Sequence, residues 1–195
     1  MGKKNDELCK FVLENYEDLE AATEVFDLGK ERLLELVKRE VFEALVEDLK
    51  DKGFEVDIDG EEIWWYPSDS GKLWWNKEKR TGLYFTLVIE PEYSESIVQP
   101  TEDEVYLALY HTDKSSVEKG KATKLRNHIL HEKSTIKKEG FLINDEGSNL
   151  VRYVPSIELN LTAIRDDSRF PVDIVKKAIK FTETLLPIVQ KYKTE

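Results

Sequence analysis

The segment FEVDIDGEEIWWY, residues 54–66, constrains the fold of this chain more than any other stretch. Apolar and polar residues alternate on both sides of Asp59-Gly60, and an Asp-Gly pair between two alternating runs is the strongest short-range signal for a β-hairpin. A two-residue turn at this pair predicts three cross-strand pairs: Ile58 with Glu61, Val56 with Ile63, and Phe54 with Trp65. We therefore expect an antiparallel hairpin here.

The two faces of this hairpin differ in chemistry, because successive strand residues point to opposite sides of a sheet. One face is expected to be core and carries Phe54, Val56, Ile63 and Trp65. The opposite face, called the aromatic–acidic face below, carries Glu55, Asp57, Glu62, Trp64 and Tyr66. This face is either covered by a helix or exposed as a surface for a partner, since Trp and Tyr are favoured anchors of interfaces.

A second tryptophan pair follows a turn-like PSDSG stretch. If the loop has four residues, Trp75 joins Trp64 on the aromatic–acidic face. If it has three residues, with Gly71 left-handed, Trp74 takes that place and Trp75 enters the core. The sequence leaves both arrangements open, and the returning segment KLWWNK is expected to form a strand in either one.

The remaining periodicities predict the fold class. The stretches fall in this order: residues 1–52 helical, 53–165 mainly strands with a helix near 118–133, and 168–193 helical. Gly53 is expected to end the N-terminal helices, and Pro187 to kink or end the last one. We therefore predict one α+β domain over residues 1–195, with N-terminal helices, a meandering mainly antiparallel sheet, a basic crossing helix and a C-terminal helix.

Charge is spread unevenly along the chain. The net charge is −11, but residues 114–138 hold seven lysines and Arg126 against two glutamates, so this segment carries +6 and the rest carries −17. An acidic body argues against general nucleic-acid binding, because affinity for phosphate depends on Lys and Arg. No apolar run approaches the roughly 18 residues of a membrane span, and the lone Cys9 cannot form an internal disulfide. We expect a soluble, cytoplasmic protein without a membrane partner.

The basic segment, residues 114–138, forms a second candidate surface. Helical spacing predicts that Leu125 and Ile129 face the sheet while the basic side chains face outward. Such a patch suits phosphate, RNA, DNA or an acidic protein, and its members are Lys121, Lys124, Arg126, His128 and His131. The alternative is an ordinary solvated helix face.

Glu55, Asp57 and Glu62 form a third candidate, because carboxylates projecting from one strand face can hold Mg²⁺ or Ca²⁺ in a metal-dependent enzyme. The alternative is a solvated acidic strand face, which antiparallel sheets commonly have. The chain has no nucleophile-elbow motif and no nucleotide-binding glycine pattern. We therefore expect no catalytic residue and no cofactor.

The order of aromatic residues and strands resembles the non-nuclease C-terminal portion of PD-(D/E)XK nuclease-type proteins from phage and bacterial defence loci. The resemblance covers residues 30–190 and is carried by residues 64–66, 74–76, 81–90, 106–111 and the closing amphipathic helix. The nuclease motif is missing, because LVIEPEY has Pro and Glu where the catalytic lysine would be needed. The resemblance therefore implies a stand-alone accessory or binding module without catalytic residues.

These features together predict a non-catalytic interaction or regulatory module. A partner protein is expected on the aromatic–acidic face, at Trp64, Tyr66, Trp75, Glu55, Asp57 and Glu62. Nucleic-acid binding through the basic segment is the alternative from a different functional class, and a metal-dependent enzyme is the third.

Overall fold

The computed structural model describes residues 10–12, 14–60, 62–68, 73–89, 105–112, 115–155 and 170–192. The chain forms two compact units, Met1–Arg39 and Glu40–Glu195. The long helix α2 (Tyr16–Asp51) begins in the first unit and ends in the second. None of the helices in these ranges is long and apolar enough to cross a membrane.

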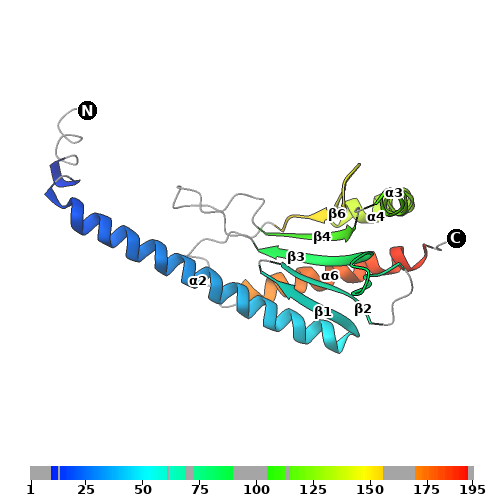
Figure 1. The fold of residues 1–195 in the computed structure, drawn as a ribbon, viewed down its shortest axis with the longest axis horizontal. Helices are drawn as coiled ribbons and strands as arrows, with labels where there is room; N and C mark the ends of the chain where they lie inside the picture. The colour runs from blue at the N-terminus through cyan, green and yellow to red at the C-terminus, as the bar shows by residue number, and fades with distance from the viewer. Residues whose placement is uncertain are drawn as a thin grey trace. The chain divides into compact units, whose positions relative to one another are not determined.

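The second unit is built on one six-stranded sheet in the order β1-β2-β3-β4-β6-β5, in which every pair is antiparallel (Figure 1). The strands are β1 (Phe54–Asp59), β2 (Glu62–Pro67), β3 (Leu83–Ile89), β4 (Val105–His111), β5 (Leu142–Ile143) and β6 (Asn149–Tyr153). Together with the helices, this sheet confirms the predicted α+β class with a mainly meandering antiparallel topology.

The predicted hairpin forms, but its register differs by two residues from the expected one. Ile58 pairs with Ile63, and Val56 pairs with Trp65, so the loop lies between Asp59 and Glu62. Gly60 has a left-handed φ of 58° in this loop, a conformation that glycine adopts without a steric penalty. Because the shift is an even number of residues, every side chain keeps its predicted face.

The segment LWWN, residues 73–76, does not add the expected strand beside β2. Instead β2 pairs directly with β3, and the segment makes isolated bridges to the start of β3, with the N–H of Trp75 donating to the carbonyl of Leu83 at 3.0 Å. Gly82 makes this close crossing sterically feasible, since a Cβ there would lie 2.4 Å from the carbonyl oxygen of Trp74. Trp74 is buried, and Trp75 is the indole on the aromatic–acidic face.

The core lies between one face of the sheet and helix α6 (Phe170–Gln190), which runs along it (Figure 1). Trp65 stacks on Phe85 at a ring-centroid distance of 5.9 Å, and Phe181 of α6 contacts the ring of Phe85 at 6.2 Å. All three side chains are fully buried. The predicted core role of Trp65 is therefore confirmed, and the aromatic–acidic face lies on the side of the sheet away from α6.

The observed ends of the helices lie near the residues predicted to start or end them. Helix α2 ends at Asp51, and Gly53 follows with a left-handed φ of 82°. The basic segment forms α3 (Ser116–His131) and α4 (Lys133–Lys138). Helix α6 runs through Pro187 and ends three residues later. Residues 156–169, where further strand was expected, lie outside the described residues.

Candidate functional site

A band of aromatic rings crosses the aromatic–acidic face. Trp64 of β2 contacts Trp75 at 4.9 Å and Tyr84 of β3 at 5.3 Å between ring centroids, and Trp75 contacts Tyr84 at 5.4 Å. Tyr84 in turn contacts Tyr110 of β4 at 4.9 Å. The four residues are neither buried nor fully exposed. This aromatic band, defined as Trp64, Trp75, Tyr84 and Tyr110, thus presents part of its ring surface to solvent.

The band borders a surface hollow of about 430 Å³ at the end nearest β1. The hollow combines three aromatic rings with charges of both signs, and its lining residues are Asp57, Ile58, Asp59, Glu62, Trp64, Trp75, Lys77, Arg80 and Tyr84. Aromatic rings in the middle of a patch with charged groups around them are the usual composition of a protein–protein contact. The hollow therefore has the composition of a binding site.

Asp57, one of the carboxylates of the hollow, forms an ion pair with Lys77. The ammonium of Lys77 lies 3.1 Å from Asp57 Oδ2, and this hydrogen-bonded contact is the main reason that the pKa of Lys77 is raised. Lys77 is exposed, so the pair contributes little to stability. Asp59 is exposed at the end of β1, on the rim of the same hollow.

Burial raises the pKa of both Tyr84 and Tyr66 on this face. Desolvation raises the pKa of Tyr84, with further contributions from Tyr110 and Glu62, because a phenolate is unfavourable away from water. Tyr66 lies on the predicted face but is only 5% exposed. Little of the Tyr66 surface is therefore accessible in this structure, and its predicted role as a contact residue stays a prediction.

The indole N–H of Trp75 is buried and has no hydrogen-bond acceptor among the described residues. Leaving a buried donor without an acceptor costs about 1–3 kcal/mol. Ring contacts with Trp64 and Tyr84 offset this cost, so the position of Trp75 depends on aromatic packing.

Tyr84, Lys77 and Arg80 were not among the predicted site residues. Tyr84 belongs to an alternating strand, and pairing that strand directly with β2 places it beside Trp64. The alternation of residues 81–90 was recognised from the sequence, but a strand was expected at residues 72–77, between β2 and this segment, so Tyr84 was not placed beside Trp64. Lys77 and Arg80 lie in the turn that returns the chain to β3, where the side-chain oxygen of Asn76 accepts a hydrogen bond from the N–H of Lys79 at 2.9 Å.

The predicted basic patch is only partly at the surface. Lys121, Lys124 and His131 are exposed. Arg126 is instead 7% exposed, and its guanidinium donates a hydrogen bond to the carbonyl of Gly147. His128 is half-buried, with Nε2 donating to the carbonyl of Ile188 at 3.0 Å. The expectation that all five basic residues face outward is therefore wrong for Arg126 and His128.

The carboxylates considered as metal ligands do not converge. Among the residues that the structure describes, no three His, Cys, Asp or Glu side chains form a group able to hold a metal ion. Asp57 pairs with Lys77, and Glu55 is an exposed residue of β1. The arrangement thus offers no support for a metal-dependent enzyme at Glu55, Asp57 and Glu62.

Comparison with known proteins gives no relative from which a role could be transferred: no family model, no curated protein and no solved structure matches this chain. The resemblance to the non-nuclease portion of PD-(D/E)XK proteins therefore stays a prediction.

Proposed function

We propose that this protein is a non-catalytic binding module that holds a basic segment of a partner protein on its aromatic–acidic face. The observation that carries the proposal is the half-exposed aromatic band beside a hollow of about 430 Å³ with carboxylates on its rim. Trp and Tyr supply large contact area with little loss of side-chain entropy, which is why they dominate binding energy at interfaces.

Charge supports a basic partner over an acidic one. The chain carries a net −11, and three carboxylates line the hollow against two cations, one of which is paired with Asp57. Complementary charge raises the association rate and rejects wrong partners, while the aromatic contacts determine most of the affinity. We place the partner's Lys or Arg side chains at the rim, near Asp59 and Glu62, and its apolar side chains over Trp64, Trp75 and Tyr84. A setting in phage or defence biology belongs to the proposal through the resemblance alone.

Random 12-residue peptides displayed on phage provide a direct test. Peptides selected on the wild-type protein should be enriched in Lys, Arg and apolar residues, and a Trp64→Ser/Trp75→Ser double variant should bind them at least tenfold more weakly. Val172→Ser, which removes a 48% exposed apolar side chain on α6, should leave the affinity unchanged. If the double variant binds the selected peptides as well as the wild type does, or if no peptide is enriched, the proposal is wrong.

Nucleic-acid binding through the basic segment is a second candidate. It is supported by exposed lysines on consecutive helices, at Lys119, Lys121 and Lys124 of α3 and at Lys133, Lys137 and Lys138 of α4. Its test is a titration with single- and double-stranded DNA and RNA at several salt concentrations, because phosphate contacts predict a linear loss of log affinity with log salt. Absence of binding at low salt would exclude it.

A further inference from the structure

The N-terminal unit has apolar side chains on the outside of a helix. Within residues 10–28, the side chains of Phe11, Val12, Tyr16, Leu19, Val25, Phe26 and Leu28 are all exposed. Their exposed fractions range from 37% for Leu19 to 71% for Val25. Scattered apolar residues at a surface are ordinary, but a contiguous set marks a contact surface.

Five of the side chains in this region follow one line along the helix. Val12, Tyr16, Leu19, Thr23 and Phe26 are separated by steps of four, three, four and three residues. This spacing is the heptad pattern by which one helix packs against another. We call these five residues the apolar stripe; its part within α2, from Tyr16 to Phe26, extends over about 15 Å, given the rise of about 1.5 Å per residue.

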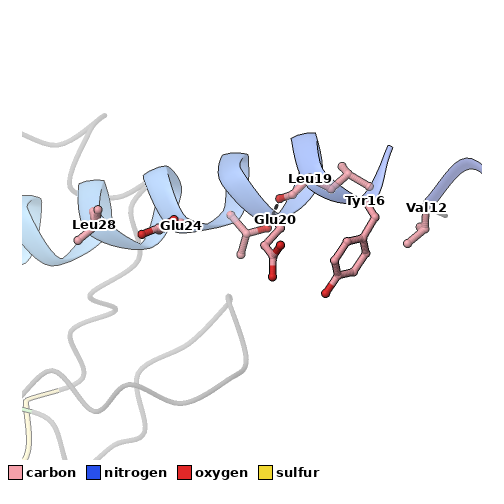
Figure 2. Close-up of a pocket in the computed structure, with 7 residues that line it drawn as sticks. Val12, Tyr16, Leu19, Glu20, Glu24 and Leu28 are labelled. Carbon is pink, nitrogen blue, oxygen red and sulfur yellow. Dashed lines mark hydrogen bonds between the residues drawn. The ribbon is translucent and has the colours of Figure 1, made fainter. Parts of the chain in front are cut away.

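The stripe borders an open hollow of about 630 Å³ along α2 (Figure 2). Val12, Tyr16, Leu19 and Thr23 line it together with Glu20, Glu24 and Leu28. The Thr23 hydroxyl donates to the carbonyl of Leu19 at 2.8 Å, so this polar member of the stripe is satisfied within the helix. A partner side chain packed there would not leave the hydroxyl without a hydrogen bond.

Helix physics indicates that this stripe needs a partner. Most helical stability in proteins comes from burying an apolar face of the helix against another element. Here the apolar face is exposed along about three turns of α2. An amphipathic helix that covered it would remove this apolar surface from water and stabilise the segment.

The acidic residues around the apolar stripe indicate which kind of helix could cover it. From Glu14 to Asp27 the sequence has six acidic residues and no basic one. Lys10, which precedes this acidic stretch, lies 3.6 Å from the carboxylate of Glu14. Two copies of this helix packed along the stripe would bring twelve carboxylates together, which is unfavourable. A partner helix with Lys or Arg beside its apolar seam would instead form opposite-charge pairs with Glu20 and Glu24, which flank the stripe.

We propose that the apolar stripe is the docking surface for an amphipathic α-helix of a partner protein whose apolar seam is flanked by Lys and Arg. This inference uses a different surface from the aromatic–acidic face and does not depend on the function proposed there.

The test uses the full chain and three designed 21-residue helical peptides. One peptide has Leu at the heptad a and d positions and Lys at the flanking e and g positions; the second has Glu in place of Lys; the third keeps Lys but has Ala in place of Leu. Fluorescence anisotropy of labelled peptides should show binding of the Leu/Lys peptide, at least tenfold weaker binding of the Ala/Lys peptide, and no binding of the Leu/Glu peptide.

A matched pair of substitutions locates the contact. Leu19→Glu places a charge in the stripe and should weaken binding of the Leu/Lys peptide at least tenfold. Val25→Glu makes the same change in charge on the opposite side of the helix and should leave the affinity within twofold of wild type. Glu is a good helix former, so neither variant loses the helix for reasons of propensity. Equal weakening by both variants, or equal binding of the Leu/Lys and Ala/Lys peptides, would overturn the proposal.

Sedimentation equilibrium of the wild type alone tests the alternative that a second copy of this chain covers the stripe. The proposal predicts a monomer at micromolar concentration. A wild-type dimer that Leu19→Glu dissociates and Val25→Glu does not would show that a second copy covers the stripe, and would overturn the assignment to a basic partner.

Discussion

The indole Nε1 of Trp65 donates a hydrogen bond of 3.0 Å to the hydroxyl of Thr182, a residue 117 positions further along the chain. The bond joins β2 to α6 inside the core, where both side chains are buried. The same hydroxyl donates to the carbonyl of Ala178 at 2.9 Å. Thr182 is thus both an acceptor for the sheet and a donor within its own helix.

Thr182→Val should destabilise the protein. The substitution keeps the shape of the side chain but leaves the buried Trp65 N–H without an acceptor, which costs about 1–3 kcal/mol. Urea unfolding followed by circular dichroism measures the change in the free energy of unfolding. Thr184→Val is the matched control, because the Thr184 hydroxyl bonds to the carbonyl of Lys180 within its own helix on the exposed side, and its cost should be below about 0.5 kcal/mol. Equal costs for the two variants would contradict the role of the Trp65 bond.

Gly82→Ala should disturb the site more than an ordinary glycine substitution. Gly82 has a φ of 125°, and the new Cβ would lie 2.4 Å from the backbone oxygen of Trp74. The LWWN segment must therefore move, and Trp75 with it, so both stability and tryptophan fluorescence should change. Gly53→Ala is the control: its φ is 82°, but no atom lies within 4 Å of the added Cβ, so its cost is limited to the backbone strain of about 1–2 kcal/mol. A smaller loss of stability for Gly82→Ala than for Gly53→Ala would contradict the close crossing.

The stability of the protein should fall at alkaline pH in a way that depends on Tyr84. Burial raises the pKa of Tyr84 above the usual value near 10, so the folded state holds this proton more tightly than the unfolded state. The resulting stabilisation is complete below pH about 10 and is lost as the pH rises toward the folded-state pKa. Unfolding free energies at pH 8 and pH 11 should therefore differ less for Tyr84→Phe than for the wild type. An identical difference in both proteins would show that Tyr84 does not contribute.

Arg126 and Lys124 lie two residues apart on α3, but only the replacement of Arg126 should destabilise the protein. Arg126→Met removes the hydrogen bond to the Gly147 carbonyl from a buried position, and hydrogen bonds to charged groups contribute about 1.5–3 kcal/mol. Lys124→Met changes an exposed side chain and should leave the unfolding free energy within about 0.5 kcal/mol of wild type. Thermal and urea unfolding measure both. If Arg126→Met is as stable as Lys124→Met, the Arg126 side chain has no structural role.

Acrylamide quenching of tryptophan fluorescence should separate the four indoles into two classes. Trp65 and Trp74 are buried, whereas Trp64 and Trp75 are half-buried on the aromatic band. We expect Trp64→Phe and Trp75→Phe to remove quenchable fluorescence, and Trp65→Phe to remove protected fluorescence. If all four indoles resist the quencher, the aromatic–acidic face is not available to a partner.

Local sequence patterns were sufficient for the fold class and for the faces of the first hairpin. The period-two alternation of residues 54–66 assigns Trp65 to the core and Trp64 to the opposite face, and this assignment holds although the turn lies one residue later than expected. Alternation survives any register shift of two residues, so the face of a side chain is more predictable than its partner. The observed register instead sets Ile58 against Ile63 and Val56 against Trp65, which pairs apolar side chains across the strands.

Contacts between distant parts of the chain decided the positions of Trp75 and Arg126. Trp75 faces the aromatic band because residues 73–76 cross the start of β3 at Gly82, a packing relation that no turn signal near residue 71 encodes. Arg126 turned inward because the carbonyl of Gly147, 21 residues away, accepts its hydrogen bond. The sequence by itself determined which residues alternate, where α2 ends and how charge is divided, because these depend on neighbouring residues. The tertiary structure alone decided the composition of the hollow and the burial of Tyr66 and Arg126, because burial depends on what the rest of the chain packs against each side chain.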